Sequence, residues 1–226
     1  MKAYTSNNIR NIAVLGHGGK GKTTLCEAML YIAGASDRLG RVADGNTVLD
    51  FDSEEKRRKS SVSSAIAALE WDNTKLNIID APGLFDFEGG AAEAVRAAEA
   101  VLIVTSAGSG VDVGTEKAFR AAEKKGAAKF FAVTKTDSDH RNFYKTFDAL
   151  KEVYGNKLCP TIIPYMEGNI TKCYVNLMTG MAFSYDENGK ATKVPVPEDS
   201  VIEEMTSAFM EAVATTDDAL MEKFFE

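Results

Sequence analysis

Histidine, tryptophan and cysteine are scarce: this chain of 226 residues contains two, one and three of them. Two histidines give little material for a histidine-based metal site or a catalytic triad. The cysteines are odd in number and lack CxxC spacing, which excludes a disulfide framework and a zinc site as interpretations. No apolar run approaches the roughly 18 residues of a membrane helix, and the polar N-terminal stretch does not resemble a secretory signal. We therefore expect a cytoplasmic protein without a membrane partner.

Positive charge is also in deficit, because 26 lysines and arginines face 33 aspartates and glutamates and leave a net charge of −7. DNA and anionic membranes repel such a chain, so nonspecific binding to either is excluded and any contact with RNA has to be local. With 45% hydrophobic and 26% charged residues, the composition is that of a globular chain long enough to bury a core. We expect a monomer with no DNA partner.

Short apolar runs alternate with helical patterns along the first part of the chain. Strands are predicted at Ile9–Leu15, Ala65–Trp71, Leu76–Ile79, Ala100–Thr105 and Phe130–Val133, and helices at Thr23–Ile32, after Gly90 and at Glu116–Lys125. This alternation predicts an α/β fold with a mostly parallel sheet and helices on both of its faces. Residues 34–64 lack any period, which is typical of a functional segment inside a compact domain.

The pattern changes after about residue 156. Strand-like pieces follow at Thr161–Ile163, Cys173–Leu177 and Met181–Tyr185, separated by turn signals such as Asp186–Gly189. A helical tail then starts at Ser200. We expect a small antiparallel α+β unit over residues 156–226, appended to a core over residues 1–155.

The loop after the first predicted strand reads GHGGKGKT and fits GxxxxGK[ST], the pattern of a phosphate-binding loop. Its glycines would let backbone N–H groups converge on phosphate oxygens at the start of a helix. Lys22 would reach the β- and γ-phosphates, and the Thr23 hydroxyl would bind Mg²⁺. The residues expected to bind nucleotide here are Gly16, His17, Gly18, Gly19, Lys20, Gly21, Lys22, Thr23 and Thr24.

This loop alone does not identify the base of the nucleotide. A glycine-rich turn with an incidental lysine would show the same letters. The loop is also one residue away from the KGGxGKT loop of partitioning-type ATPases, with His17 at the position of their signature lysine. Two later motifs decide between these alternatives.

Each of the two motifs follows a predicted strand. The sequence DAPG at residues 80–83 fits DxxG, in which the aspartate holds a Mg²⁺-bound water and the glycine N–H binds the γ-phosphate. The sequence TKTD follows at residues 134–137. There the Asp137 carboxylate would accept two N–H bonds from guanine, a pair that adenine cannot donate, and the Lys135 stem would cover the ring. The order of the three motifs favours a guanine nucleotide.

Taken together, GHGGKGKTTL, the segment RVADGNTVLDFDSEEKRRKSSVSSA, DAPGLFDF and TKTD resemble the GTPase domain of the elongation factor G family. TIIPYMEGNI, VPVPED and DDALMEKFFE resemble the insert subdomain of that family, and the form of the switch segment is similar to its factor G-like paralogues. The resemblance implies a P-loop GTPase core over residues 1–155 and an insert subdomain over residues 156–226. It also implies that the chain is part of a longer multidomain factor.

The resemblance further implies ligands, a partner and residue roles. GTP, GDP and Mg²⁺ would be bound, and the ribosome would be the partner of the full-length factor. Lys22 and Gly83 would be catalytic, whereas Thr23, Ser61 and Asp80 would hold the metal. Ser61 stands where the family has a switch threonine. Outside the phosphate loop, the expected nucleotide contacts are Asp80, Gly83, Thr134, Lys135 and Asp137.

Several positions depart from the family pattern. Thr134 replaces the usual asparagine of the base motif, and Gly19 replaces an acidic residue that assists a monovalent cation. The largest departure is Leu84, which stands where the family has a histidine that orients the attacking water. Leucine has no hydrogen-bonding group, so we predict GTP binding with slow hydrolysis. A GTP-binding switch that does not hydrolyse GTP is the alternative.

Overall fold

The computed structural model describes residues 2–136, 142–155, 158–168, 170–186 and 189–225. Its internal contacts divide the chain into a first unit, Met1–Lys135, and a second unit, Thr136–Glu226. Within the described residues, no helix is long and apolar enough to cross a membrane.

The first unit is built on a five-stranded sheet with the order β2-β3-β1-β4-β5. β1 pairs in parallel with both β3 and β4, β4 pairs in parallel with β5, and β2 pairs antiparallel with β3. The strands are β1 (Ile9–Leu15), β2 (Ala65–Trp71), β3 (Thr74–Asp80), β4 (Ala100–Ser106) and β5 (Ala128–Thr134). The predicted mostly parallel α/β sheet is confirmed, and its antiparallel edge comes from the hairpin that turns at Asp72 and Asn73.

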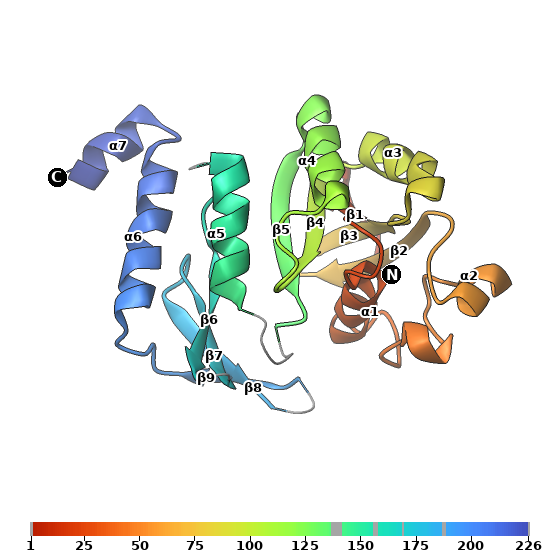
Figure 1. The fold of residues 1–226 in the computed structure, drawn as a ribbon, viewed down its shortest axis with the longest axis horizontal. Helices are drawn as coiled ribbons and strands as arrows, with labels where there is room; N and C mark the ends of the chain where they lie inside the picture. Colours follow the sequence, from red (N-terminus) through yellow and green to blue (C-terminus); the bar gives the residue numbers. More distant parts are fainter. Residues whose placement is uncertain (1, 137–141, 156–157, 169, 187–188, 226) are drawn as a thin grey trace. The chain divides into compact units, whose positions relative to one another are not determined.

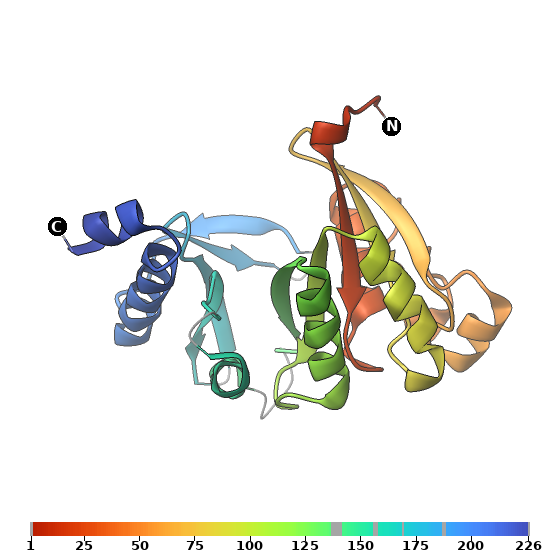
Figure 2. The ribbon, with the colours of Figure 1, turned by 90° about the horizontal axis from the view of Figure 1, so that it is seen from above.

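Helices cover both faces of this sheet because the strands are apolar on both sides (Figure 2). Ala13 and Leu15 of β1 pack in one cluster with α3 and α4, whereas Val14 packs in a second cluster with α1. This alternation is the two-residue period of a strand. The helices are α1 (Lys22–Ile32), α3 (Glu88–Ala97) and α4 (Val113–Lys125). The 3-10 turn η1 (Ser6–Asn8) directly precedes β1, and η3 (Phe85–Phe87) directly precedes α3.

The segment without a sequence period contains short helical pieces, η2 (Val42–Asp44) and α2 (Ser53–Arg58). α2 begins at a capping box: the Asp52 side chain accepts from the Glu54 N–H at 2.7 Å, and Glu55 Oε2 accepts from the Asp52 N–H at 3.2 Å. The helix ends at Lys59, which has a left-handed backbone with φ 53°. Side chain–backbone hydrogen bonds therefore order this helix, and Leu49 ahead of it packs in the cluster of α1 and β2.

The second unit is a four-stranded antiparallel sheet with the order β6-β7-β8-β9, accompanied by helices (Figure 1). Its cluster of buried side chains includes Ile163, Val175 and Ile202, and Phe143 packs against it. The elements are α5 (Phe143–Tyr154), β6 (Ile162–Glu167), β7 (Ile170–Asn176), β8 (Met181–Tyr185), β9 (Ala191–Val194), α6 (Ser200–Ala214) and α7 (Asp218–Phe225).

The contacts divide the chain after Lys135, whereas the sequence predicts a boundary after residue 155. α5 accounts for the difference. Phe143 of this helix packs on the cluster of the second unit, and the Tyr144 hydroxyl donates to the Pro164 carbonyl of β6 at 2.7 Å. The predicted boundary leaves the residues of α5 in the core, because a sequence pattern cannot show which sheet a helix packs on.

Two adjacent glycines at the start of α3 give a matched test of the fold. A Cβ on Gly89 would meet no atom within 4 Å, whereas a Cβ on Gly90 would lie 2.8 Å from Ser64 Oγ and 3.0 Å from Pro82 Cδ. We expect Gly89→Ala to raise the free energy of unfolding by about 0.5 kcal/mol, because alanine loses less backbone entropy in a helix. We expect Gly90→Ala to lower it. Urea unfolding measures both, and a gain at position 90 equal to that at position 89 would contradict this packing.

Candidate functional site: a phosphate-binding loop and two switch segments

The phosphate loop, residues 16–23, joins β1 to α1 at the carboxyl end of the sheet. Gly16 has φ +139°, and a Cβ there would collide with the Val104 carbonyl of β4, so the chain leaves the sheet by a path open only to glycine. Gly21 is the N-cap of α1 with φ 87°, and Lys22 and Thr23 are the first residues of that helix. The unpaired N–H groups of the first helical turn therefore face the loop and favour an anion there.

The end of β5 holds this loop from behind. The Thr134 hydroxyl donates to the Lys20 carbonyl at 2.7 Å and also lies 3.1 Å from the Thr105 carbonyl. Lys135 Nζ donates to the Gly19 carbonyl at 2.6 Å. Two of the four residues of the predicted base motif thus fasten the backbone of the phosphate loop, a role that the motif's sequence does not reveal.

Hydroxyl and carboxylate groups from four segments meet at the first turn of α1. Thr23 Oγ1 donates to Asp80 Oδ2 at 2.6 Å, and Ser61 Oγ donates to Asp50 Oδ1 at 2.7 Å. The oxygens of Thr23 and Ser61 lie 3.1 Å apart. All four side chains are buried. The three residues predicted to hold a metal therefore lie together, and Asp50 joins them.

This group of four fits Mg²⁺. Asp50 Oδ2 and Asp80 Oδ1 are buried and have no hydrogen-bond partner, which is costly unless a cation or water satisfies them. The separation of the two hydroxyl oxygens is close to the roughly 3.0 Å expected for neighbouring ligands of an octahedral cation of this size. Among the described residues, no cluster of three or more His, Cys, Asp or Glu side chains could hold a metal. Mg²⁺ here would depend on hydroxyls and on phosphate oxygens.

Burial changes the ionisation of the groups around this position. It raises the pKa of Asp80 to about 7, although the hydrogen bond from Thr23 and the charge of Lys22 oppose the shift. Burial also raises the pKa of Asp50, against the hydrogen bond from Ser61, and lowers the pKa of Lys22. Burial thus disfavours the charged forms of both carboxyl groups and of the ammonium group. A bound cation would favour the charged carboxylates, and bound phosphates would favour the charged ammonium.

A cavity of about 200 Å³ opens where these groups meet the phosphate loop. Of the predicted nucleotide-binding residues, it is lined by Gly18, Gly19, Gly21, Lys22, Thr23, Thr24, Gly83 and Lys135, and Ser61 and Asp50 line it as well. The remaining ones that are described lie around it. Lys20 forms an ion pair with Asp112 at 3.1 Å, the His17 ring lies 5.5 Å from the Phe85 ring, and Asp137 falls outside the described residues.

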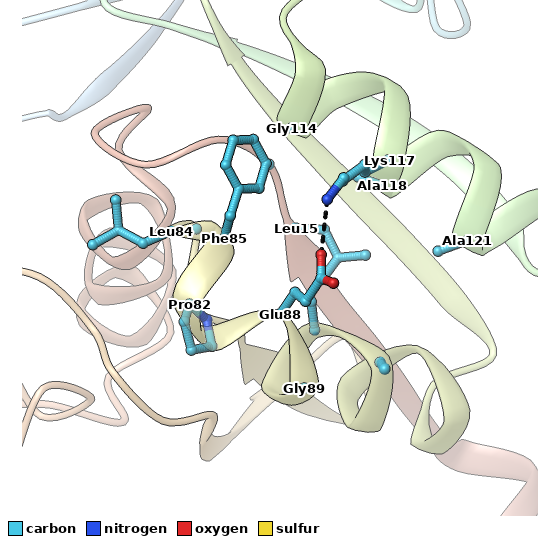
Figure 3. A pocket seen from close by; sticks show the side chains of 14 residues that line it. Leu15, Pro82, Leu84, Phe85, Glu88, Gly89, Gly114, Lys117, Ala118 and Ala121 are labelled. Atoms are coloured by element: carbon cyan, nitrogen blue, oxygen red, sulfur yellow. Dashed lines mark hydrogen bonds and ion pairs between the residues drawn. The ribbon is translucent and has the colours of Figure 1, made fainter.

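The DxxG motif and the residues that follow it form a segment that we call the second switch. It touches the phosphate loop at Gly83. A Cβ on Gly83 would collide with Lys22 Nζ and would lie 2.8 Å from Gly18 N and 2.9 Å from Gly16 O. Leu84, next in the chain, also approaches the loop: a Cβ on Gly18 would be 2.9 Å from Leu84 Cδ2. The leucine side chain is 39% exposed and points away from Phe85 (Figure 3).

A second cavity, of about 450 Å³, lies on the other side of this switch, between α3 and α4 (Figure 3). Small side chains of the two helices leave it open, and Lys117 closes its rim by an ion pair with Glu88 at 2.8 Å. Lys117 Nζ also lies 4.5 Å from the centre of the Phe85 ring. This cavity is larger, but the phosphate loop and the buried hydroxyls face the smaller one. We therefore place the chemistry in the smaller cavity.

Sequence reasoning missed Asp50. It is one of several acidic residues in the segment without a period, and only its contact with Ser61 distinguishes it from Asp44 and Asp52. Glu27 and Glu55, both buried, were also missed. The capping-box spacing from Asp52 to Glu55 was a local signal that could have revealed the second of them.

A phosphate loop between a parallel strand and a helix, a DxxG turn against it and a base motif after β5 define a P-loop GTPase domain. The model of the family described as the elongation factor Tu GTP binding domain matches residues 7–222. The chain therefore belongs to this family, as a domain of the elongation factor G type, and the resemblance seen in the sequence is confirmed. This membership decides against the partitioning-type ATPase.

Relatives cover nearly the whole chain. It is 33% identical over 219 residues to an elongation factor G-like protein of Mycobacterium tuberculosis, which covers 96% of the chain and 30% of that protein. It is 30% identical over 223 residues to elongation factor G of Mycoplasma genitalium, covering 97% of the chain and 32% of that protein. A crystal structure of a protein from Thermus thermophilus superposes with a TM-score of 0.90 at 36% identity, over 96% of the chain and 33% of that protein. The chain thus spans about a third of the length of these relatives.

Proposed function

We propose that this domain binds GTP and GDP together with Mg²⁺, hydrolyses GTP slowly, and acts at the ribosome as part of a full-length factor in the cytoplasm. The family supports a guanine nucleotide, and the names of its relatives support a translation factor. The observation that carries the slow hydrolysis is Leu84. Its apolar side chain lies against Gly18, a residue of the smaller cavity where the γ-phosphate would sit, and lines the larger cavity on its other side.

Different groups of the chain bind the phosphates, hold the metal and recognise the base. Lys22 and the N–H groups of the phosphate loop bind the phosphates, and the Gly83 N–H binds the γ-phosphate, which is present in GTP and absent in GDP. Thr23 and Ser61 would hold Mg²⁺, with Asp50 and Asp80 behind them. When bound, the cation neutralises charge on the β- and γ-phosphate oxygens. Asp137 and Lys135 read the guanine. Leu84 cannot accept or donate a hydrogen bond, so no side chain at this position orients the attacking water.

Leu84→His tests the proposal directly. We expect the native domain to hydrolyse GTP on the order of 10⁻⁴ per second in a single turnover without a partner. A histidine there should raise the rate by about tenfold or more by orienting water, within the range of general acid–base effects. Leu84→Ala is the matched control and should stay at the native rate, because it removes bulk without adding a polar group.

Two outcomes would contradict the proposal. A native domain that turns over GTP faster than about once per second without a partner would show that another group does the work of the histidine. An unchanged rate in Leu84→His would refute the role given to Leu84. The same assay with ribosomes separates the alternatives: acceleration supports a ribosome-activated GTPase, and no acceleration supports a GTP-binding switch that does not hydrolyse GTP.

A further inference from the structure

Two fully buried glutamates hold the backbone of residues 40–63, the first switch segment. Glu27 of α1 is 0% exposed, and its Oε1 accepts the N–H groups of Val48 at 2.8 Å and Leu49 at 3.0 Å. A Cβ on Gly40 would collide with the other oxygen of this carboxylate, so the segment passes directly over it. Leu49 immediately precedes Asp50, whose carboxylate faces the metal position.

Glu55 of α2 makes the corresponding contacts at the other end of the segment. It is 1% exposed, and its Oε1 accepts the N–H groups of Val62 at 3.0 Å and Ser63 at 3.2 Å. The Ser63 hydroxyl lies 3.3 Å from the same oxygen. Val62 immediately follows Ser61, whose hydroxyl also faces the metal position. Each metal-facing side chain of the segment is therefore one residue away from a peptide N–H bound to a buried carboxylate.

Burying these carboxylates costs desolvation free energy, because neither has a lysine or arginine partner among the ion pairs of the described residues. Backbone N–H groups replace the lost water at Glu27 Oε1 and at both oxygens of Glu55, whereas Glu27 Oε2 is buried without a hydrogen-bond partner. Hydrogen bonds to a charged acceptor are stronger than neutral ones. A glutamine of the same shape would accept more weakly, and rotation of its amide would set N–H groups against N–H groups. Replacing either glutamate by glutamine therefore keeps the shape of the side chain and removes the carboxylate.

The two glutamates differ in what they connect. Glu27 lies on the helix that begins with Lys22 and Thr23, so it joins the Asp50 end of the segment to the phosphate-binding helix itself. Glu55 lies within the segment, so it joins the Ser61 end only to α2. The contact of the Ser61 end with α1 then depends on Ser61 itself, whose oxygen lies 3.1 Å from that of Thr23.

We propose that Glu27 and Glu55 are positioning residues with separate tasks. Glu27 keeps Asp50 at the metal position in both nucleotide states. Glu55 folds Ser61 and α2 into one body that docks when GTP and Mg²⁺ are bound and leaves when GDP remains. This inference rests on the proposed function, since it assigns the parts of a GTP/GDP switch.

Hydrogen exchange on the native domain provides the first test. With a nonhydrolysable GTP analogue and Mg²⁺, we expect the N–H groups of Val48, Leu49, Val62 and Ser63 all to be protected. With GDP and Mg²⁺, the protection of Val48 and Leu49 should persist, whereas that of Val62 and Ser63 should fall by about tenfold or more as the body undocks. Equal protection at both ends in both states would overturn the separation of tasks.

Three variants provide the second test, read out as the Mg²⁺ concentration that gives half-maximal retardation of nucleotide release. We expect Glu55→Gln to raise this concentration by about tenfold with the GTP analogue and to change it little with GDP. Glu27→Gln should raise it with both nucleotides. Glu54→Gln is the matched control: it is the neighbouring glutamate of α2, pairs at the surface with Arg57 and Arg58, and should change neither value.

The outcomes separate this inference from the proposed function. If the native domain does not bind the GTP analogue, or binds it without any effect of Mg²⁺, the proposed function fails. If the native domain behaves as proposed but Glu55→Gln shifts both nucleotides equally, or neither, the positioning role fails. A variant that does not fold, judged by far-UV circular dichroism, leaves the decision to hydrogen exchange on the native domain.

Discussion

Replacing Gly83 by alanine is expected to lower the affinity for GTP by about 100-fold. A loss of this size corresponds to the hydrogen bonds that the Lys22 ammonium group would make to the phosphates. The added Cβ would collide with Lys22 Nζ and would also lie within 3 Å of Gly18 N and Gly16 O. The lysine end can move aside, but then it no longer reaches the phosphates. The two backbone atoms belong to the phosphate loop and cannot move without opening it.

Titration of the domain with a fluorescent GTP analogue measures this effect. Gly89→Ala serves as the control, because it adds the same methyl group six residues later at a position where no atom lies within 4 Å. We expect that control to bind like the native domain. Affinity within about threefold of native in Gly83→Ala would mean that the second switch does not approach the loop as closely as the structure has it.

Replacing Thr23 by alanine is expected to raise the Mg²⁺ concentration needed for tight GTP binding by about 100-fold, the upper end of the loss seen when support at a metal site is removed. The hydroxyl is one of two that face the metal position, and it donates to Asp80 Oδ2 at 2.6 Å. Without this hydroxyl, neither oxygen of Asp80 has a hydrogen-bond partner, in a residue that is 1% exposed. That carboxylate then takes up a proton and no longer supports a cation.

Thr23→Ser keeps the hydroxyl and removes only a methyl group, so we expect it to stay within about threefold of native. The measurement is nucleotide release at a series of Mg²⁺ concentrations. If Thr23→Ala and Thr23→Ser respond alike, the methyl group rather than the hydroxyl matters, and the metal position is not where we place it.

The parts of the site that were visible in the sequence are the ones built from consecutive residues. The phosphate loop needs only a strand, a glycine-rich turn and a helix in order, and Asp80 and Gly83 need only the end of the next parallel strand. The turn at Asp72 and Asn73 was also visible in the sequence, because Asp and Asn are favoured in two-residue hairpin turns. Both residues have the left-handed backbone of such a turn, with φ of 43° and 57°.

The parts that were hidden depend on contacts across the fold. Asp50 becomes a site residue only through Ser61, and Glu27 becomes a holding group only through the backbone of Val48 and Leu49. The helical pattern of α1 does not distinguish Glu27 from the exposed polar residues of that helix. Likewise, the place of α5 in the second unit follows from the face on which it packs, and the alternation of strand and helix does not contain that information.

β1 pairs in parallel with β3, so the site cannot be assembled from local contacts. Thr23 and Asp80, which share a hydrogen bond, stand 57 residues apart in the chain. A loop of that length must close before they meet, and such non-local pairing slows folding. The β2–β3 hairpin, joined by two residues, has no such delay. A refolding chain should therefore form this hairpin early and recover its affinity for nucleotide late. The rate at which nucleotide binding returns then measures the rate at which β1 pairs with β3.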